Sequence, residues 1–296
     1  MIEVRDLVKA FNGFRALDGL NLTVPQGAVY GLVGPNGAGK STMIRHLAGI
    51  YRQDGGSVRI FGEEVFENPR VKARLSYIPD EIFFYPQATG MDLAGLYAGV
   101  IPAFSKENFS RLGALFEADL NRPMRKLSKG MQKQVAFCLA LSSSPDVVIL
   151  DEPVDGLDPV MRRQVWRLLL ADVAERGATV LVSSHNLREL EDVCDHVGIM
   201  NHGRMLLEHS VEDLQENIIK LQAVFPGDKL PELDGVLFHT AAGRLQQYVI
   251  RGSRKAIEAE VARCAPVYTE FIPLTLEEIF IYELGGAENE IRNILV

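Results

Sequence analysis

The sequence is 296 residues long, 47% hydrophobic and 24% charged, with a formal net charge of −8. This length allows one large domain, or one large domain plus a smaller one. An acidic chain without a stripe of Lys and Arg is a poor candidate for electrostatic binding of nucleic acid. The three cysteines, Cys138, Cys194 and Cys264, have the spacing of neither a zinc site nor a disulfide framework, and they indicate buried thiols in a reducing compartment.

No segment of the sequence has the apolar length of a membrane span, which is about 18–20 residues. The first five residues lead directly into a strand-like segment, so we expect no signal peptide. We therefore expect a cytosolic chain whose role at a membrane, if it has one, comes through a partner.

Residues 2–30 alternate apolar and polar side chains between turn signals, which predicts an antiparallel β layer. Phe11 precedes the Asn12-Gly13 turn and has an aromatic face that can stack on a nucleotide base. From the local sequence alone, packing against the sheet explains Phe11 equally well.

Residues 34–42 fit the phosphate-loop pattern G-x-x-x-x-G-K-[ST] between a predicted strand (29–33) and a predicted helix (42–48). Glycines let backbone N–H groups approach an anion, and the helix N-terminus adds partial positive charge. Lys40 can reach the β- and γ-phosphates, while the Ser41 hydroxyl can hold Mg²⁺. A glycine-rich turn without a ligand is the alternative, but the complete pattern favours a nucleoside triphosphate site. The expected nucleotide contacts are Gly34, Pro35, Asn36, Gly37, Ala38, Gly39, Lys40, Ser41 and Thr42.

Two later apolar strands, 147–150 and 179–184, end in polar side chains. Asp151 can hold the water shell of Mg²⁺, and Glu152 can orient and deprotonate an attacking water. His185 can hydrogen-bond a γ-phosphate. A solvated acidic turn and a histidine beside a helix cap are the alternatives. Strands alternate with helices here, which predicts a mostly parallel α/β sheet whose strand ends bring these residues and the phosphate loop together.

The segments between these strands are predicted to be helical. Apolar spacing indicates a helical insert over about 89–126 and a helix that runs to about 141. Asp158 and Pro159 are expected to begin a helix that Gly177 ends. Asn186, supported by Glu189, is expected to cap the helix after His185.

Residues 127–132, Leu-Ser-Lys-Gly-Met-Gln, are similar to the L-S-G-G-Q signature of the ATP-binding cassette (ABC) family. With the phosphate loop, Asp151-Glu152, the Gly156-Leu157-Asp158 D-loop and His185 in family order, residues 2–220 resemble the nucleotide-binding subunit of an ABC transporter. This resemblance implies a P-loop NTPase of ABC ATPase type in residues 1–215, with an antiparallel β subdomain and a helical subdomain at about 86–140.

The resemblance further implies an ATPase coupled to transport through a separate transmembrane permease subunit, at the inner face of the cell membrane. Two such subunits, identical or different, dimerise head to tail in this family. Each ATP lies between one phosphate loop and the partner's signature, here Ser128, Lys129, Gly130 and Met131. Asp158 is expected to link the two sites, and Phe11 to stack on the base.

The sequence departs from the family pattern in two places. Asp80 stands where the family has glutamine; a carboxylate can ligate Mg²⁺ directly, but it adds negative charge and cannot donate a hydrogen bond. The expected metal ligands are therefore Ser41, Asp80 and Asp151. In the signature, Lys129 and Met131 replace glycine and glutamine, and this form is similar to that of antimicrobial-peptide and multidrug exporters. Lys129 either lies near the partner's nucleotide or only offsets acidic surface.

The aromatic residues Phe83, Phe84 and Tyr85 stand at the start of the helical insert. In the family this region receives a short helix of the transmembrane subunit, although core packing explains each aromatic side chain equally well. Beyond it, residues 216–296 are expected to form a small α+β accessory domain with strands at 219–225, 235–240, 245–251 and 267–272 and helices at 254–264 and 276–284. A dimer-stabilising or regulatory role for this domain is a hypothesis.

The main alternative is a soluble ABC ATPase that acts on nucleic acid or ribosomes without transport. The chain has one phosphate loop, and Lys40 and Ser128 are 88 residues apart without heptads, which argues against the two-cassette and coiled-coil types. A GTPase is disfavoured because no Asn-Lys-x-Asp element is present. The sequence thus favours an ATP-driven exporter subunit, whose substrate it does not reveal.

Overall fold

The computed structural model describes residues 1–226 and 231–283. These residues form two compact units. The first combines residues 1–185 with 198–208, and the second combines residues 186–197 with the described residues after 208. Among the described residues, no helix is both long enough and apolar enough to span a bilayer.

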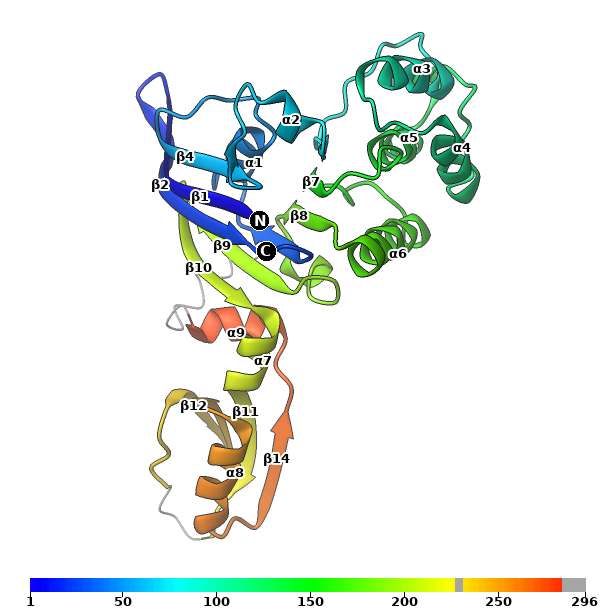
Figure 1. Ribbon diagram of the computed structural model, residues 1–296. Coiled ribbons are helices and arrows are strands. Elements are labelled where there is room, and N and C mark those ends of the chain that lie inside the picture. Colours follow the sequence, from blue (N-terminus) through cyan, green and yellow to red (C-terminus); the bar gives the residue numbers. More distant parts are fainter. Residues whose placement is uncertain (227–230, 284–296) are drawn as a thin grey trace. The chain divides into compact units, whose positions relative to one another are not determined.

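An antiparallel sheet of four strands begins the first unit (Figure 1). Ile2 of its first strand pairs with Val24 on one side and Ile60 on the other. Ile2 and Val4 are buried while Glu3 is exposed, as expected for a strand with one face on the core. The predicted antiparallel layer is confirmed. The order of its strands is β2 (Phe14–Val24), β1 (Ile2–Phe11), β4 (Gly55–Ile60) and β5 (Glu63–Glu64).

A six-stranded sheet lies at the centre of the same unit and packs against the antiparallel layer through a shared apolar core that includes Leu32, Ile149 and Leu181. Four of its strands form a parallel run, β3-β8-β7-β6. Every residue of β3, β7 and β8 is buried, which explains why these segments are continuous apolar runs rather than alternating ones. The order is β10 (Arg204–Ser210), β9 (His196–Asn201), β3 (Val29–Val33), β8 (Thr179–Ser184), β7 (Val147–Asp151) and β6 (Leu75–Ile78).

The helices of the first unit begin and end at recognisable signals. Asp158 accepts hydrogen bonds from the N–H groups of Val160 and Met161 and so caps α6 (Pro159–Arg176), which Gly177 ends in the left-handed conformation, as predicted. The helical insert is three α-helices and a 3₁₀ turn, grouped together in Figure 1. The remaining helical elements are α1 (Lys40–Leu47), α2 (Pro69–Lys72), α3 (Gly90–Val100), α4 (Lys106–Leu115), η1 (Met124–Lys126) and α5 (Lys129–Leu141).

The second unit contains a four-stranded sheet and α8 (Arg254–Arg263), which share a core that includes Tyr248, Ile257 and Val261. Gly243 takes a positive φ of 64° in the β12–β13 turn, a conformation that glycine adopts without strain. The sheet order is β12 (Val236–Ala242), β13 (Leu245–Arg251), β11 (Ile218–Val224) and β14 (Tyr268–Ile272), and α7 (Val211–Asn217) precedes it.

Residues 186–197 belong to the second unit, and the turn at their start packs with α9 (Leu276–Glu283). The predicted helix is wrong here: the chain makes only the 3₁₀ turn η2 (Leu187–Glu189), although Asn186 does cap it by accepting from the N–H of Arg188. After it the chain continues in turns, in which the N–H groups of Val193 and Cys194 donate to the carbonyl oxygen of Leu190, until β9 begins at His196. The predicted helix 276–284 is confirmed to residue 283; residue 284, like 285–296 and 227–230 of the expected accessory domain, lies outside the described residues.

The three cysteines are all free thiols. Cys138 and Cys194 are buried as expected, and burial raises the pKa of Cys138 to about 12. Cys264 is only partly buried, so the expectation of burial is wrong for it, because it lies at the end of α8 near the surface.

Candidate functional site

The phosphate-loop residues connect β3 to α1, and two of their glycines are fixed by close contacts. A Cβ on Gly34 would lie 2.3 Å from the carbonyl oxygen of Met200. Gly39 has a φ of 104°, and its Cβ would lie 2.8 Å from the carbonyl oxygen of Ala16. Both positions therefore require glycine for packing as well as for the approach of an anion.

Lys40 is the first residue of α1 and only 6% exposed. Its Nζ donates to the carbonyl oxygens of Gly34 (2.5 Å) and Pro35 (3.4 Å) and lies 3.4 Å from Oε1 of Glu152. The ammonium group is thus held between the loop and the carboxylate at the end of β7. A cation there can neutralise phosphate oxygens brought into the loop.

Asp151 ends β7 and is 2% exposed. Its Oδ1 accepts a hydrogen bond of 2.7 Å from the hydroxyl of Ser183 on β8, and the same hydroxyl oxygen accepts from the N–H of Glu152 at 3.1 Å. One serine therefore fixes both the buried carboxylate and the backbone of the residue that follows it. The second carboxylate oxygen has a hard-donor character suited to Mg²⁺ or its water shell.

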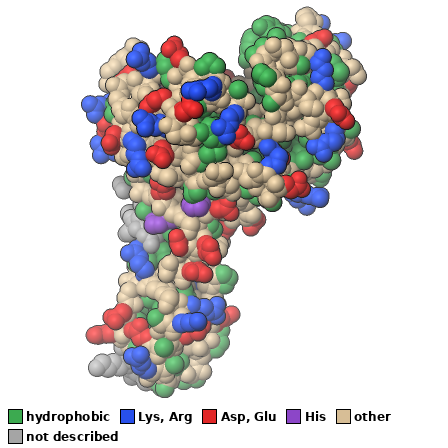
Figure 2. Space-filling model, viewed as in Figure 1, with side chains coloured by type: hydrophobic (Ala, Val, Ile, Leu, Met, Phe, Trp, Pro, Cys, Tyr) green, Lys and Arg blue, Asp and Glu red, His purple; other side chains and the backbone are tan. Residues whose placement is uncertain are grey.

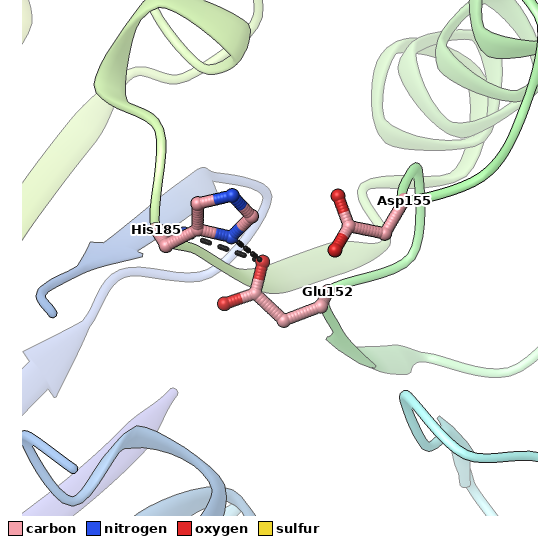
Figure 3. Close-up of side chains that lie close together, drawn as sticks. All are labelled: Glu152, Asp155 and His185. Atoms are coloured by element: carbon pink, nitrogen blue, oxygen red, sulfur yellow. Dashed lines mark hydrogen bonds and ion pairs between the residues drawn. The ribbon is translucent and has the colours of Figure 1, made fainter. Parts of the chain in front are cut away.

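Glu152, Asp155 and His185 point toward one another (Figure 3). Oε2 of Glu152 lies 3.0 Å from the ring nitrogen Nδ1 of His185. The same oxygen accepts a hydrogen bond of 3.2 Å from the backbone N–H of His185. Together with a carboxylate oxygen of Asp155, these ligand-type atoms lie within 4.8 Å of one another. Glu152 has a φ of 46°, a left-handed conformation that is costly for a residue other than glycine and that surrounding contacts must hold.

The signature residues lie at the start of α5. Ser128 is exposed and caps this helix, its Oγ accepting from the N–H of Met131 at 3.3 Å. Lys129 is also exposed, and Gly130 faces the backbone of Gly156. Within the described chain, no hydrogen bond or ion pair joins residues 128–131 to the phosphate loop. The structure thus brings Lys40, Glu152 and His185 together and leaves the signature apart from them.

Two other predicted contacts lie at strand ends. Phe11, at the end of β1, is 39% exposed and stands edge-on to Tyr51, with ring centroids 5.5 Å apart. Asp80 is exposed just after β6. Although its side chain is exposed, nearby protein atoms displace part of its hydration and raise the pKa of Asp80; Lys133 counteracts this rise, and Asp151 adds to it.

Sequence reasoning did not single out three residues at this site: Ser183, Lys133 and Asp155. Lys133 is 7% exposed, and its Nζ donates to the carbonyl oxygens of Glu152 (3.0 Å) and Asp155 (2.8 Å). A lysine on the buried side of a helix was the signal that could have identified it. Asp155 could have been noted as a third carboxylate within four residues of Asp151.

A groove of about 430 Å³ lies between the end of β6 and the helical insert. It is lined by Phe83, Phe84 and Tyr85 together with apolar residues of α3 and α5, among them Leu96. Phe83 is 86% exposed and Tyr85 64% exposed, so the core-packing interpretation is wrong for these two side chains. Exposed apolar surface of this kind is typical of an interaction site.

Comparisons with known proteins agree on one family. The family model described as ABC transporter matches residues 17–155. The chain is 32% identical to the ABC transporter ATP-binding protein YtrB of Bacillus subtilis, over 97% of this chain and 99% of that protein. It is 37% identical to the daunorubicin/doxorubicin resistance ATP-binding protein DrrA of Streptomyces peucetius (73% and 67% covered) and 34% identical to the bacitracin transport ATP-binding protein BcrA of Bacillus licheniformis (73% and 72%).

Solved structures show the same fold. A structure described as the ATP binding subunit of an ABC transporter is 29% identical, with a TM-score of 0.67 over 73% of this chain and 92% of that one. The dimeric structure of the bacterial ABC transporter cassette MJ0796 is 22% identical, with a TM-score of 0.66 over 71% and 99%. The relatives named here are transporter proteins and give no support to the non-transport alternative. The chain belongs to the ATP-binding proteins of ABC transporters, and it is an ATPase of that family whose hydrolysis of ATP is coupled to transport.

Proposed function

We propose that this chain drives export of a substrate through a separate membrane subunit, with Glu152 as the base that activates water for hydrolysis of ATP. The observation on which this rests is the continuous set of contacts from Lys40 through Glu152 to His185, at the carboxyl ends of β3, β7 and β8. The base for water, Glu152, thus lies 3.4 Å from a cation for the phosphates and 3.0 Å from a histidine.

Mg²⁺ fits the oxygen donors on the same edge of the sheet. Asp151 is held by Ser183 through one oxygen only, and Ser41 follows Lys40 at the start of α1. We assign Ser41 and Asp151 to the metal and its water shell, with Asp80 as a supporting ligand. The metal supplies charge neutralisation at the phosphates. If Asp80→Ala hydrolysed ATP at the wild-type rate across a Mg²⁺ titration, the role of Asp80 would be wrong.

The second half of each ATP site comes from another ABC ATPase subunit. Within residues 1–226 and 231–283, the exposed Ser128 makes no hydrogen bond to its own phosphate loop, which supports an action of Ser128, Lys129, Gly130 and Met131 in trans. The solved MJ0796 cassette, which shares this fold, is described as a dimer. In this arrangement Asp158 lies near the junction of the two sites and Phe11 stacks on the base.

Two substitutions test this half-site arrangement. Lys40→Ala is expected to abolish ATP binding by the chain itself. Ser128→Arg is expected to leave that binding intact but to block ATP-dependent dimerisation and turnover. Ser110→Arg, at an exposed serine of α4, is the matched control because it adds the same charge to the helical insert. Full ATPase activity of Ser128→Arg would contradict the arrangement.

The groove between Phe83 and Leu96 is proposed to receive a short helix of the permease, which holds the chain at the inner face of the cell membrane. Its exposed aromatic side chains support this assignment. Phe84→Asp is expected to reduce co-purification with the membrane partner more than ATP binding. Leu115→Asp, at a 49% exposed residue of α4, is the control. Equal loss of both properties in Phe84→Asp would indicate misfolding and remove the support.

Export is favoured over import because the relatives include proteins named for drug resistance and for bacitracin transport. We propose residues 1–215 as the nucleotide-binding domain and 216–296 as an accessory domain. Nucleic acid is not expected as a partner; on the face shown in Figure 2, basic and acidic side chains are interspersed rather than gathered by sign. Isolation of a dimer bound to RNA and free of any membrane protein would contradict the transport assignment.

A further inference from the structure

Two lysines are buried within the described part of the chain, Lys40 and Lys133, and both contact Glu152. Lys40 lies beside the carboxylate of Glu152, whereas Lys133 bonds to its backbone. The role of Lys40 follows from the phosphate loop. Lys133 lies on the signature helix α5, one turn after Lys129. The proposed hydrolysis of ATP gives it no role.

The backbone that Lys133 holds is conformationally strained. Glu152 has a φ of 46°, in the left-handed region that is unfavourable for a residue other than glycine. Its N–H is fixed by Ser183, and its carbonyl oxygen is fixed by Lys133 at 3.0 Å. The same ammonium group reaches the carbonyl oxygen of Asp155 at 2.8 Å and so closes the loop 152–155 against the helix. The direction of the Glu152 side chain depends on these two anchors.

The charges around Lys133 explain why an ammonium group is tolerated there. A hollow of about 520 Å³ beside it is lined by Asp80, Lys129 and Asp155, among others. Burial lowers the pKa of Lys133, but the carboxylates of Asp80, Asp155 and Glu152 oppose this effect. An amide or apolar group of similar length would fill the space without balancing these carboxylates.

We propose that Lys133 is a positioning residue that orients the catalytic Glu152 from the signature helix of the same chain, an inference that rests on the proposed function. Helix α5 then connects the two half-sites, because it carries both Ser128 and Lys133. The N-terminus of α5 presents Ser128 to the partner's nucleotide. About one turn further along α5, Lys133 binds the loop 152–155, which carries Glu152, the base that acts on the chain's own nucleotide. A displacement of α5 on dimer closure therefore reaches Glu152 directly.

The test uses the full chain and compares Lys133→Met with the exposed-lysine control Lys126→Met. Lys133→Met is expected to lower kcat about 10- to 100-fold, because a shift of about 1 Å in a catalytic group costs rate on that scale. Its Kd for ATP is expected to stay within about twofold of wild type, since Lys40 and the phosphate loop are untouched. Lys126→Met is expected to match wild type in both.

A double substitution separates positioning from a general loss of structure. If Lys133 acts through Glu152, Lys133→Met should cost little further residual rate in a Glu152→Gln background. Losses that multiply, or a wild-type kcat in Lys133→Met, would overturn the inference. Should Lys133→Met not fold, Lys133→Leu also removes the donor to the two carbonyl oxygens and is held to the same criteria. An inactive wild-type chain, by contrast, would contradict the proposed function itself.

Discussion

Removing the hydroxyl of Ser183 tests the arrangement at the ends of β7 and β8. This hydroxyl donates to Oδ1 of Asp151 at 2.7 Å and accepts from the N–H of Glu152 at 3.1 Å, and Ser183 is fully buried. Ser183→Ala leaves a nearly buried carboxylate without one donor and a backbone N–H without its acceptor. No water-filled space replaces them, because the substitution frees the volume of a single oxygen atom.

The expected loss follows from these two bonds. A hydrogen bond to a charged group contributes about 1.5–3 kcal/mol, and a neutral one contributes about 1 kcal/mol. We therefore expect Ser183→Ala to lower the free energy of unfolding by about 2–4 kcal/mol. For a unit of this size, that corresponds to a decrease in Tm of roughly 5–15 °C. Because Glu152 loses its N–H anchor, kcat should also fall about 10-fold or more.

Ser76→Ala is the matched control. Ser76 lies on β6 of the same sheet, is buried, and donates at 2.7 Å to a neutral acceptor, the carbonyl oxygen of Ala140. Its loss should cost only about 1 kcal/mol and leave kcat unchanged. Thermal unfolding and steady-state hydrolysis of both variants measure the difference. Equal Tm losses, or a wild-type kcat in Ser183→Ala, would refute the reasoning.

Three further predictions concern Glu278, Gly39 and Glu152. Glu278→Gln should lower stability at neutral pH by up to about 1 kcal/mol, because Glu278 lies 2.8 Å from Lys220. Burial by itself would raise the pKa of Glu278, but the hydrogen bonds from Lys220 and Thr275 outweigh it and lower this pKa below 4.5. The stability it contributes is present above pH 4.5 and is lost as the pH falls through its folded-state pKa, so wild type and variant should converge in acid unfolding curves. Gly39→Ala should lose at least about 10-fold in ATP affinity measured by titration, because its Cβ would strike the carbonyl oxygen of Ala16 at 2.8 Å; unchanged affinity would show that the loop relaxes at no cost. Glu152→Gln should bind ATP normally yet hydrolyse it at least about 100-fold more slowly in a phosphate-release assay, and a normal rate would exclude Glu152 as the base.

Much of the first unit could be predicted because its signals are local. The strands β7 and β8 are buried on both faces, so their apolar runs mark them almost to the residue. Asp158-Pro159 and Gly177 define α6 because capping and the left-handed end depend only on nearby backbone groups. The meeting of strand ends at one edge follows from parallel topology.

The contacts of Lys133 could not be predicted, because its partners are main-chain carbonyl oxygens that have no sequence signature. The length of the helical segment after Asn186 could not be predicted from the sequence either. Its capping signal is real, but the position of β9 and the packing of α9 leave room for only one 3₁₀ turn. Tertiary packing decided the length of this element, whereas local propensity decided only where it begins.

The boundary of the second unit has a consequence for how this chain can be divided. Residues 186–197 belong to one compact unit with the C-terminal segment: Arg188 pairs with Glu277 at 2.7 Å, and Glu191 accepts from the N–H of Leu276 at 2.8 Å. A chain cut at residue 215 would lack α9 and would leave Arg188 and Glu191 without these partners. Grafting the C-terminal unit onto another cassette therefore requires the transfer of residues 186–197 with it, because this unit is built from two separate segments of the sequence.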